Sequence, residues 1–226
     1  MPTKKLGNLH GRIAYGCAGS AGLKQRVVER LRATISAEDC ELPLCELRPK
    51  IFKVVNQLQH DALAEHVQLT NSEPAHVAFL FGGVDDGTPW IYEIDVAGRD
   101  QEHFISEAIG QAAHFAHYGL MHHNHYELAK RDLKQVRMFA FRITANTILT
   151  DASGAAGVGS IQMYQVDSTG ATELSDDEMK AMAYTLGVWQ TRERDIFAGF
   201  HGAEDGGAAG SSPVEKDASA DDGIKL

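Results

Sequence analysis

The sequence has 226 residues and a net charge of -10, and 43% of its residues are hydrophobic. Length and apolar content suit one large domain or two small ones with a sizeable core. The acidic balance excludes nucleic acid as a partner, because phosphate binding needs a basic surface. No apolar run reaches the roughly 18 residues of a membrane span, so we expect no membrane partner. Three cysteines without metal-site spacing favour a reducing cytoplasm over a disulfide framework.

The first predicted elements are one strand and two helices. Residues 12–19, "RIAYGCAG", form an apolar run closed by glycines, which predicts a buried strand and a tight turn. The next segment places apolar residues on one helical face: Leu23, Val27, Val28, Leu31 and Ile35. A second helix is predicted from about 48 to 67, with Pro49 in its first turn.

Three strands are predicted next. Residues 75–84 are a short apolar run, residues 88–98 alternate weakly, and "DDGT" between them is typical of a hairpin turn. Residues 101–110 follow a second turn and are predicted as a third antiparallel strand.

The C-terminal half begins with two predicted helices, at 111–123 and 125–149. The second carries a predicted core stripe: Leu128, Leu133, Val136, Phe139, Ala140 and Ile143. Residues 160–170 alternate as a strand, and Ser175 with Glu178 predicts a capping box for a last helix to about Arg194. Beyond Phe200 the Gly-, Ala- and Ser-rich acidic segment predicts a disordered tail.

Strands and helices alternate in blocks rather than one by one. This order favours an α+β protein with antiparallel sheets over a single parallel sheet. It resembles the proteasome-type N-terminal-nucleophile hydrolases over Lys4 to about Arg194. Four stretches carry the resemblance, in order and spacing: "KKLGNLHGRIAYGCAGSAGLKQ", "AFLFGGVDDGTPWIYEIDVAG", "ISEAIGQAA" and "VGSIQMYQVDSTGATELSDDEM". The resemblance implies a four-layer αββα sandwich of antiparallel sheets.

The resemblance also implies site residues. Lys5 corresponds to the family's catalytic lysine, Gly19 to its oxyanion-hole glycine, and Asp151 with Ser153 to the aspartate–serine pair beside the free amine. Gln111 stands where the family more often has a hydroxyl residue. Each residue also has an ordinary interpretation: a solvated lysine, a glycine needed for backbone conformation, and two turn residues.

The family's nucleophilic threonine, and the two strands that precede its lysine, have no counterpart here. Thr3 is only two positions from Lys5 and cannot reach the same point. Two explanations stay open: the sequence is a fragment of a longer protein, which we favour, or a degenerate relative with a structural role. Removing two strands would uncover apolar surface and unpaired ladder groups.

Histidines gather between positions 114 and 125. His114 and His117 lie three residues apart, so both could reach one metal ion. Among carboxylates and cysteines, only Glu127 in the following helix lies at a suitable offset. We therefore expect no metal ligands and no cofactor.

The sequence predicts a proteasome-like domain over 1–200 and a tail over 201–226. The predicted function is that of a threonine-type peptide or amide hydrolase family member in the cytoplasm, with the nucleophile absent from this chain. Expected partners are copies of itself or related subunits in a ring, and a peptide substrate if the protein is active. Two alternatives remain: a non-catalytic ring subunit, and an unrelated small-molecule- or metal-binding protein.

Overall fold

The structure is a computed structural model that describes residues 4–69, 74–124, 132–150 and 161–202. The chain divides into two compact units, residues 1–186 and 187–226. The described strands all lie in the first unit, whereas the last helix, α5 (Asp176–Gly202), begins in the first unit and ends in the second. None of the described helices combines the length and apolar character needed to cross a bilayer.

A five-stranded sheet forms the centre of the first unit. Its strands are β1 (Leu6–Leu9), β2 (Ile13–Gly19), β3 (Val77–Asp85), β4 (Thr88–Ile94) and β5 (Asp100–His103). They lie in the order β1-β2-β3-β4-β5, and every neighbouring pair is antiparallel. The predicted antiparallel α+β organisation is therefore confirmed.

Tight turns join the first and third pairs of strands. Asp86 and Gly87 both have positive φ, of 45° and 76°, as a type I′ hairpin turn requires. The predicted hairpin at "DDGT" is thus confirmed. Three residues, His10 to Arg12, join β1 to β2, and His10 and Gly11 also have positive φ, of 48° and 72°. Our sequence analysis missed β1, because its four residues are too few to show alternation.

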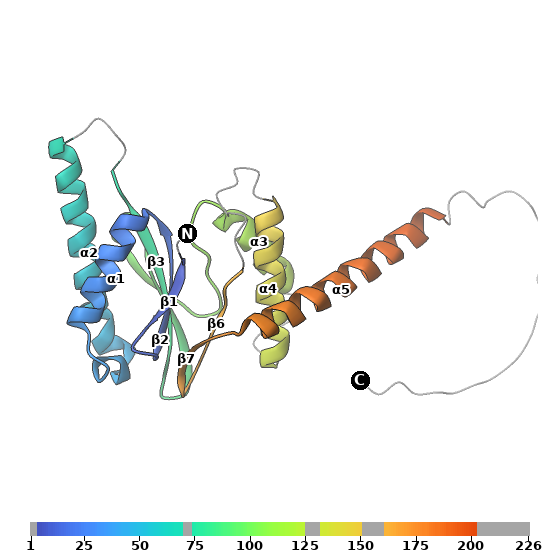
Figure 1. The fold of residues 1–226 in the computed structure, drawn as a ribbon, viewed down its shortest axis with the longest axis horizontal. Coiled ribbons are helices and arrows are strands. Elements are labelled where there is room, and N and C mark those ends of the chain that lie inside the picture. Colours follow the sequence, from blue (N-terminus) through green and yellow to red (C-terminus); the bar gives the residue numbers. More distant parts are fainter. Residues whose placement is uncertain (1–3, 70–73, 125–131, 151–160, 203–226) are drawn as a thin grey trace, which may run out of the picture. The chain divides into compact units, whose positions relative to one another are not determined.

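Helices α1 (Ala21–Thr34) and α2 (Leu44–Leu69) cover one face of this sheet (Figure 1). A short 3-10 helix, η1 (Asp39–Glu41), joins them. The predicted apolar face of α1 is confirmed, since Leu23, Val27, Val28 and Leu31 are all buried. These side chains share one core with alternate residues of β2, β3 and β4.

Helix α2 begins earlier than predicted. Asp85 accepts a hydrogen bond from the N–H of Leu44 at 3.1 Å, and the carbonyl of Pro43 accepts from the N–H of Leu47 at 3.0 Å. These contacts satisfy donors of the first turn, so the helix starts at Leu44. Pro49 therefore lies inside the helix, where its ring leaves one carbonyl of the preceding turn without its helical donor.

Helices α3 (Ala113–Asn124) and α4 (Leu133–Thr150) pack against each other. Two details of the prediction are wrong. The Asp132 carboxylate accepts from the N–H of Gln135 at 2.8 Å, so α4 starts after Asp132 instead of at 125. The core stripe is only partly right: Ile143 is buried as predicted, whereas Leu133 and Val136 are 52% and 37% exposed, and Phe141, outside the predicted stripe, is buried. Residues 125–131, with Leu128, lie outside the described part.

A second hairpin, β6 (Tyr164–Asp167) and β7 (Gly170–Glu173), contacts β2 and β3. It replaces the single predicted strand of 160–170. A second core cluster joins α4 to the start of α5 through Phe141, Leu174, Met182 and Leu186. The predicted capping box of α5 is confirmed: Glu178 accepts from the N–H of Ser175 at 2.9 Å, and the Ser175 hydroxyl accepts from the N–H of Glu178 at 3.3 Å. The helix runs on to Gly202.

The hairpin is tied to the N-terminal strands by polar contacts. The N–H of Ala171 donates to the carbonyl of Gly11 at 2.7 Å. The Lys4 ammonium lies 3.2 Å from the Glu173 carboxylate, 169 positions further along the chain. Gly170, with φ of +133°, brings β7 so close to Gly11 that a Cβ would meet the carbonyl oxygen of Gly11 at 2.3 Å. The β1–β2 turn and β7 therefore form one contact region.

Asp167, at the β6–β7 turn, provides a test by pH titration. Its carboxylate accepts from the hydroxyl and the N–H of Thr169 at 2.6 and 2.8 Å, and these bonds lower the pKa of Asp167 from 3.8 to about 2. The lowered pKa means that the carboxylate stabilises the fold above pH 3.8, and that this contribution is lost as the pH falls through about 2. We expect an NMR titration midpoint near 2 for this carboxyl group.

The Thr169→Ala variant removes the hydroxyl donor and is expected to raise that midpoint. Thr172, on the neighbouring strand β7, makes no such bond within the described part of the chain, so Thr172→Ala should leave the midpoint in place. Equal midpoints in all three proteins would contradict the assignment.

Candidate active site

Lys5 lies at the edge of the sheet, directly before β1. Its carbonyl accepts a hydrogen bond from the N–H of Cys17 at 3.0 Å, which extends the β1–β2 ladder by one residue. The Cys17 thiol donates to the same carbonyl at 3.3 Å. Two donors thus fix the backbone of Lys5 opposite Cys17, two residues before the end of β2.

Gly19 is the last residue of β2 and has a φ of +116°, which side chains rarely adopt. A Cβ at this position would lie 2.3 Å from the carbonyl oxygen of His76. The next residue, Ser20, donates its N–H to that carbonyl at 2.8 Å, and its hydroxyl caps α1 by accepting from the N–H of Leu23 at 3.4 Å. The position therefore requires glycine for close packing against the segment before β3.

The amide of Gly19 points toward the side of β2 on which Lys5 lies. Successive N–H groups of a strand point to opposite edges. Cys17 donates toward Lys5 and Ser20 donates toward His76, so the N–H of Gly19 takes the direction of Cys17. The backbone thus brings two residues of the predicted site, Lys5 and Gly19, to one edge.

The charge around Cys17 comes from two lysines. Burial raises the pKa of the Cys17 thiol above its ordinary value, and the ammonium groups of Lys24 and Lys5 partly oppose this rise. Because the net direction is upward, the thiol stays protonated at neutral pH and is not a nucleophile. Our sequence analysis did not single out Cys17 or Lys24. Lys24 lies on α1, one turn after its N-cap, Ser20. Because Ser20 directly follows β2, this position in the sequence indicates that Lys24 lies near the end of β2.

A loop before α3 reaches the same strand end. A Cβ at Gly110, whose φ is +102°, would lie 3.0 Å from the Cβ of Ala18. Gln111 follows directly and is exposed. Gln111, where the family more often has a hydroxyl residue, therefore lies next to a residue that contacts β2. Asp151 and Ser153 lie outside the described residues.

The fold and this strand end define an α+β protein with an antiparallel sheet, two helices on one face and a lysine beside a strand-terminal glycine. A family model described as "Proteasome subunit" matches residues 2–158. Because this match covers more than half of the chain, the protein belongs to the proteasome subunit family, which confirms the resemblance found in the sequence. A search of curated proteins gave no match.

Proposed function

We infer that this protein is a subunit of a proteasome-type ring and that Lys5 and Gly19 serve the hydrolysis of peptide bonds. The observation that supports this is the hydrogen bond from Cys17 to the carbonyl of Lys5. It sets the lysine and the N–H of Gly19 at one edge of β2. The proposal includes a four-layer αββα domain over 1–200, a tail over 201–226 and a cytoplasmic location, where thiols such as those of the three free cysteines stay reduced.

The chemistry assigned to these residues is that of an activated hydroxyl nucleophile. A hydroxyl that attacks a peptide carbonyl must lose its proton, and a nearby ammonium lowers the barrier electrostatically or carries that proton. The tetrahedral intermediate then bears a negative oxygen, which a backbone N–H can stabilise. Lys5 takes the first role and the N–H of Gly19 the second. Asp151 and Ser153 support the free amine in this proposal, and the proposal assigns no nucleophile within the described residues.

The second candidate function is that of a non-catalytic ring subunit. Gln111 favours it, because an amide side chain replaces the usual hydroxyl next to the strand end. The steric need for glycine at position 19 favours it too, since packing alone explains that residue. Both functions place the chain in a ring with copies of itself or related subunits.

The test compares peptide turnover of the assembled full-length protein with that of two lysine variants. With fluorogenic peptides, Lys5→Ala is expected to lower turnover at least about 100-fold, as for loss of a group that assists proton transfer. Lys4→Ala is the matched control. The Lys4 ammonium pairs with Glu173 at the surface, so its loss should leave turnover near the wild-type rate.

Sedimentation of the same samples shows whether the subunits have assembled into a ring. Assembled wild-type protein that neither cleaves peptides nor reacts with a threonine-directed inhibitor would support the non-catalytic subunit. Equal turnover in wild-type protein and Lys5→Ala would exclude a catalytic role for Lys5.

A further inference from the structure

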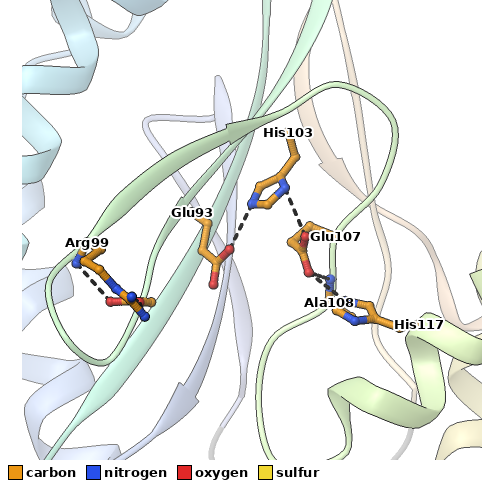
Figure 2. Close-up of polar contacts among 7 residues, drawn as sticks. Glu93, Arg99, His103, Glu107, Ala108 and His117 are labelled. Atoms are coloured by element: carbon orange, nitrogen blue, oxygen red, sulfur yellow. Dashed lines mark hydrogen bonds and ion pairs between the residues drawn. The ribbon is translucent and has the colours of Figure 1, made fainter.

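Three metal-ligating side chains meet outside the candidate active site. Glu93, His103 and Glu107 each offer a ligand atom, and these atoms all lie within 4.8 Å of one another. Figure 2 shows the imidazole of His103 between the two carboxylates. We propose that these three residues, the Glu–His–Glu cluster, bind one divalent transition-metal ion of the zinc type.

The sheet places two of the three ligands. Along β4, Trp90, Tyr92 and Ile94 face the helical core, so Glu93 points to the opposite face. His103 pairs with Ile91, two residues before Glu93, which makes the two side chains diagonal neighbours on that face. The ring nitrogen Nε2 of His103 lies 2.9 Å from the carboxylate of Glu93.

Glu107 enters from the loop after β5 and is held in position by its own contacts. One carboxylate oxygen lies 3.0 Å from Nδ1 of His103. The other accepts from the N–H of Ala108 at 2.7 Å and lies 2.7 Å from Nε2 of His117 on α3 (Figure 2). Partners of this kind orient a ligand before a metal binds, so His117 is an outer-shell residue of the site.

The charge of the cluster favours a cation. The side chains of Glu93, His103 and Glu107 are only 21%, 13% and 15% exposed. Within the described part of the chain, neither glutamate pairs with a lysine or arginine, and the nearby Arg99 is paired with Asp95 at 2.7 Å. With a neutral imidazole, two partly buried negative charges remain, and such charges are costly unless they are paired or bind a metal. One divalent ion would balance both.

The donor set suits zinc. Zn²⁺ takes imidazole nitrogen and carboxylate oxygen at about 2.0–2.2 Å, and three protein ligands leave a fourth position for water. His103 would coordinate the ion through one of its two ring nitrogens. Of the three ligands, Glu93 also lines an open cleft, together with Asp95, Arg99, Asp100 and Gln101.

This site differs from the one considered in the sequence. The spacing of His114 and His117 suggested a shared ion, with Glu127 as the nearest carboxylate. In the structure, His117 instead contacts Glu107, while the His114 ring packs tilted against that of Phe115, with ring centroids 3.9 Å apart. Glu127 lies outside the described residues.

The test is a calorimetric titration of tag-free, EDTA-treated full-length protein with Zn²⁺. We expect one ion per chain. Glu107→Gln and His103→Ala are each expected to weaken binding at least about 100-fold, and His117→Ala about 10- to 100-fold, as for an outer-shell partner. Glu93→Gln and Glu107→Gln keep the side-chain shape, so they test the ligands even if His103→Ala does not fold.

His114→Ala is the matched control, because His114 lies on the same helix as His117 and is also exposed, but its ring packs against Phe115. This variant should bind Zn²⁺ like the wild type. Substitution by Co²⁺ separates this site from the cysteines, because thiolate ligands add an intense near-ultraviolet band that nitrogen and oxygen ligands lack. The proposal would be overturned by a thiolate band in the bound form, by zinc affinity unchanged in both glutamate variants, or by no binding to wild-type protein.

Discussion

Replacing Gly19 with alanine is expected to lower the free energy of unfolding by about 2–4 kcal/mol. The new Cβ would lie 2.3 Å from the carbonyl oxygen of His76 and 3.0 Å from the Cα of Val77, so the backbone at the β2–β3 pairing must shift. The φ of +116° adds strain for any residue with a side chain. Urea unfolding followed by circular dichroism measures the change.

Gly22→Ala is the matched control for this result. Gly22 lies in the first turn of α1, and among the described residues no heavy atom outside its chain neighbours and its own helix backbone lies within 4 Å of its ideal Cβ. Alanine there should raise the free energy of unfolding by roughly 0.5 kcal/mol, because glycine is a poor helix former. Similar stabilities for Gly19→Ala and Gly22→Ala would show that the strand end does not require glycine.

The second large effect is expected for Phe79→Ala, which should lower the free energy of unfolding by about 3–5 kcal/mol. Phe79 is fully buried in β3, and its ring centroid lies 5.6 Å from that of Phe81 and 6.3 Å from that of Tyr15. Truncation removes aromatic contacts with both rings and leaves a cavity beneath α1 and α2. The same urea measurement applies.

Phe104→Ala serves as the control, since Phe104 is 91% exposed. Its expected change is within about 0.5 kcal/mol. A loss at Phe104 as large as that at Phe79 would mean that Phe104 is covered in solution, for example by a neighbouring subunit.

Periodicity predicted the elements that pack into the larger core. The stripe of α1 and the apolar run of β3 are both buried, because the period of each sequence matches the geometry of its element. Elements fixed by distant partners were predicted less well. β1 depends on pairing with β2, the start of α2 depends on Asp85, and the buried face of α4 depends on its contacts with α5.

The two candidate sites also differ in how far the sequence predicted them. Lys5 and Gly19 were found through a resemblance that spans consecutive elements, and their proximity follows from one short hairpin. The Glu–His–Glu cluster was not foreseen, because it depends on the register between β4 and β5 and on the path of the loop that carries Glu107. Once the hairpin register is known, the diagonal placement of Glu93 and His103 can be read from the sequence.

The contacts of Lys4 with Glu173 and of Gly11 with Ala171 have a consequence for biosynthesis. They join the first strands to a hairpin that leaves the ribosome about 160 residues later. A chain with such long-range contacts has a high contact order and is therefore expected to fold slowly. The nascent N-terminal hairpin is therefore expected to keep one side uncovered until residues 170–173 have been synthesised, and a strand edge exposed in this way favours aggregation.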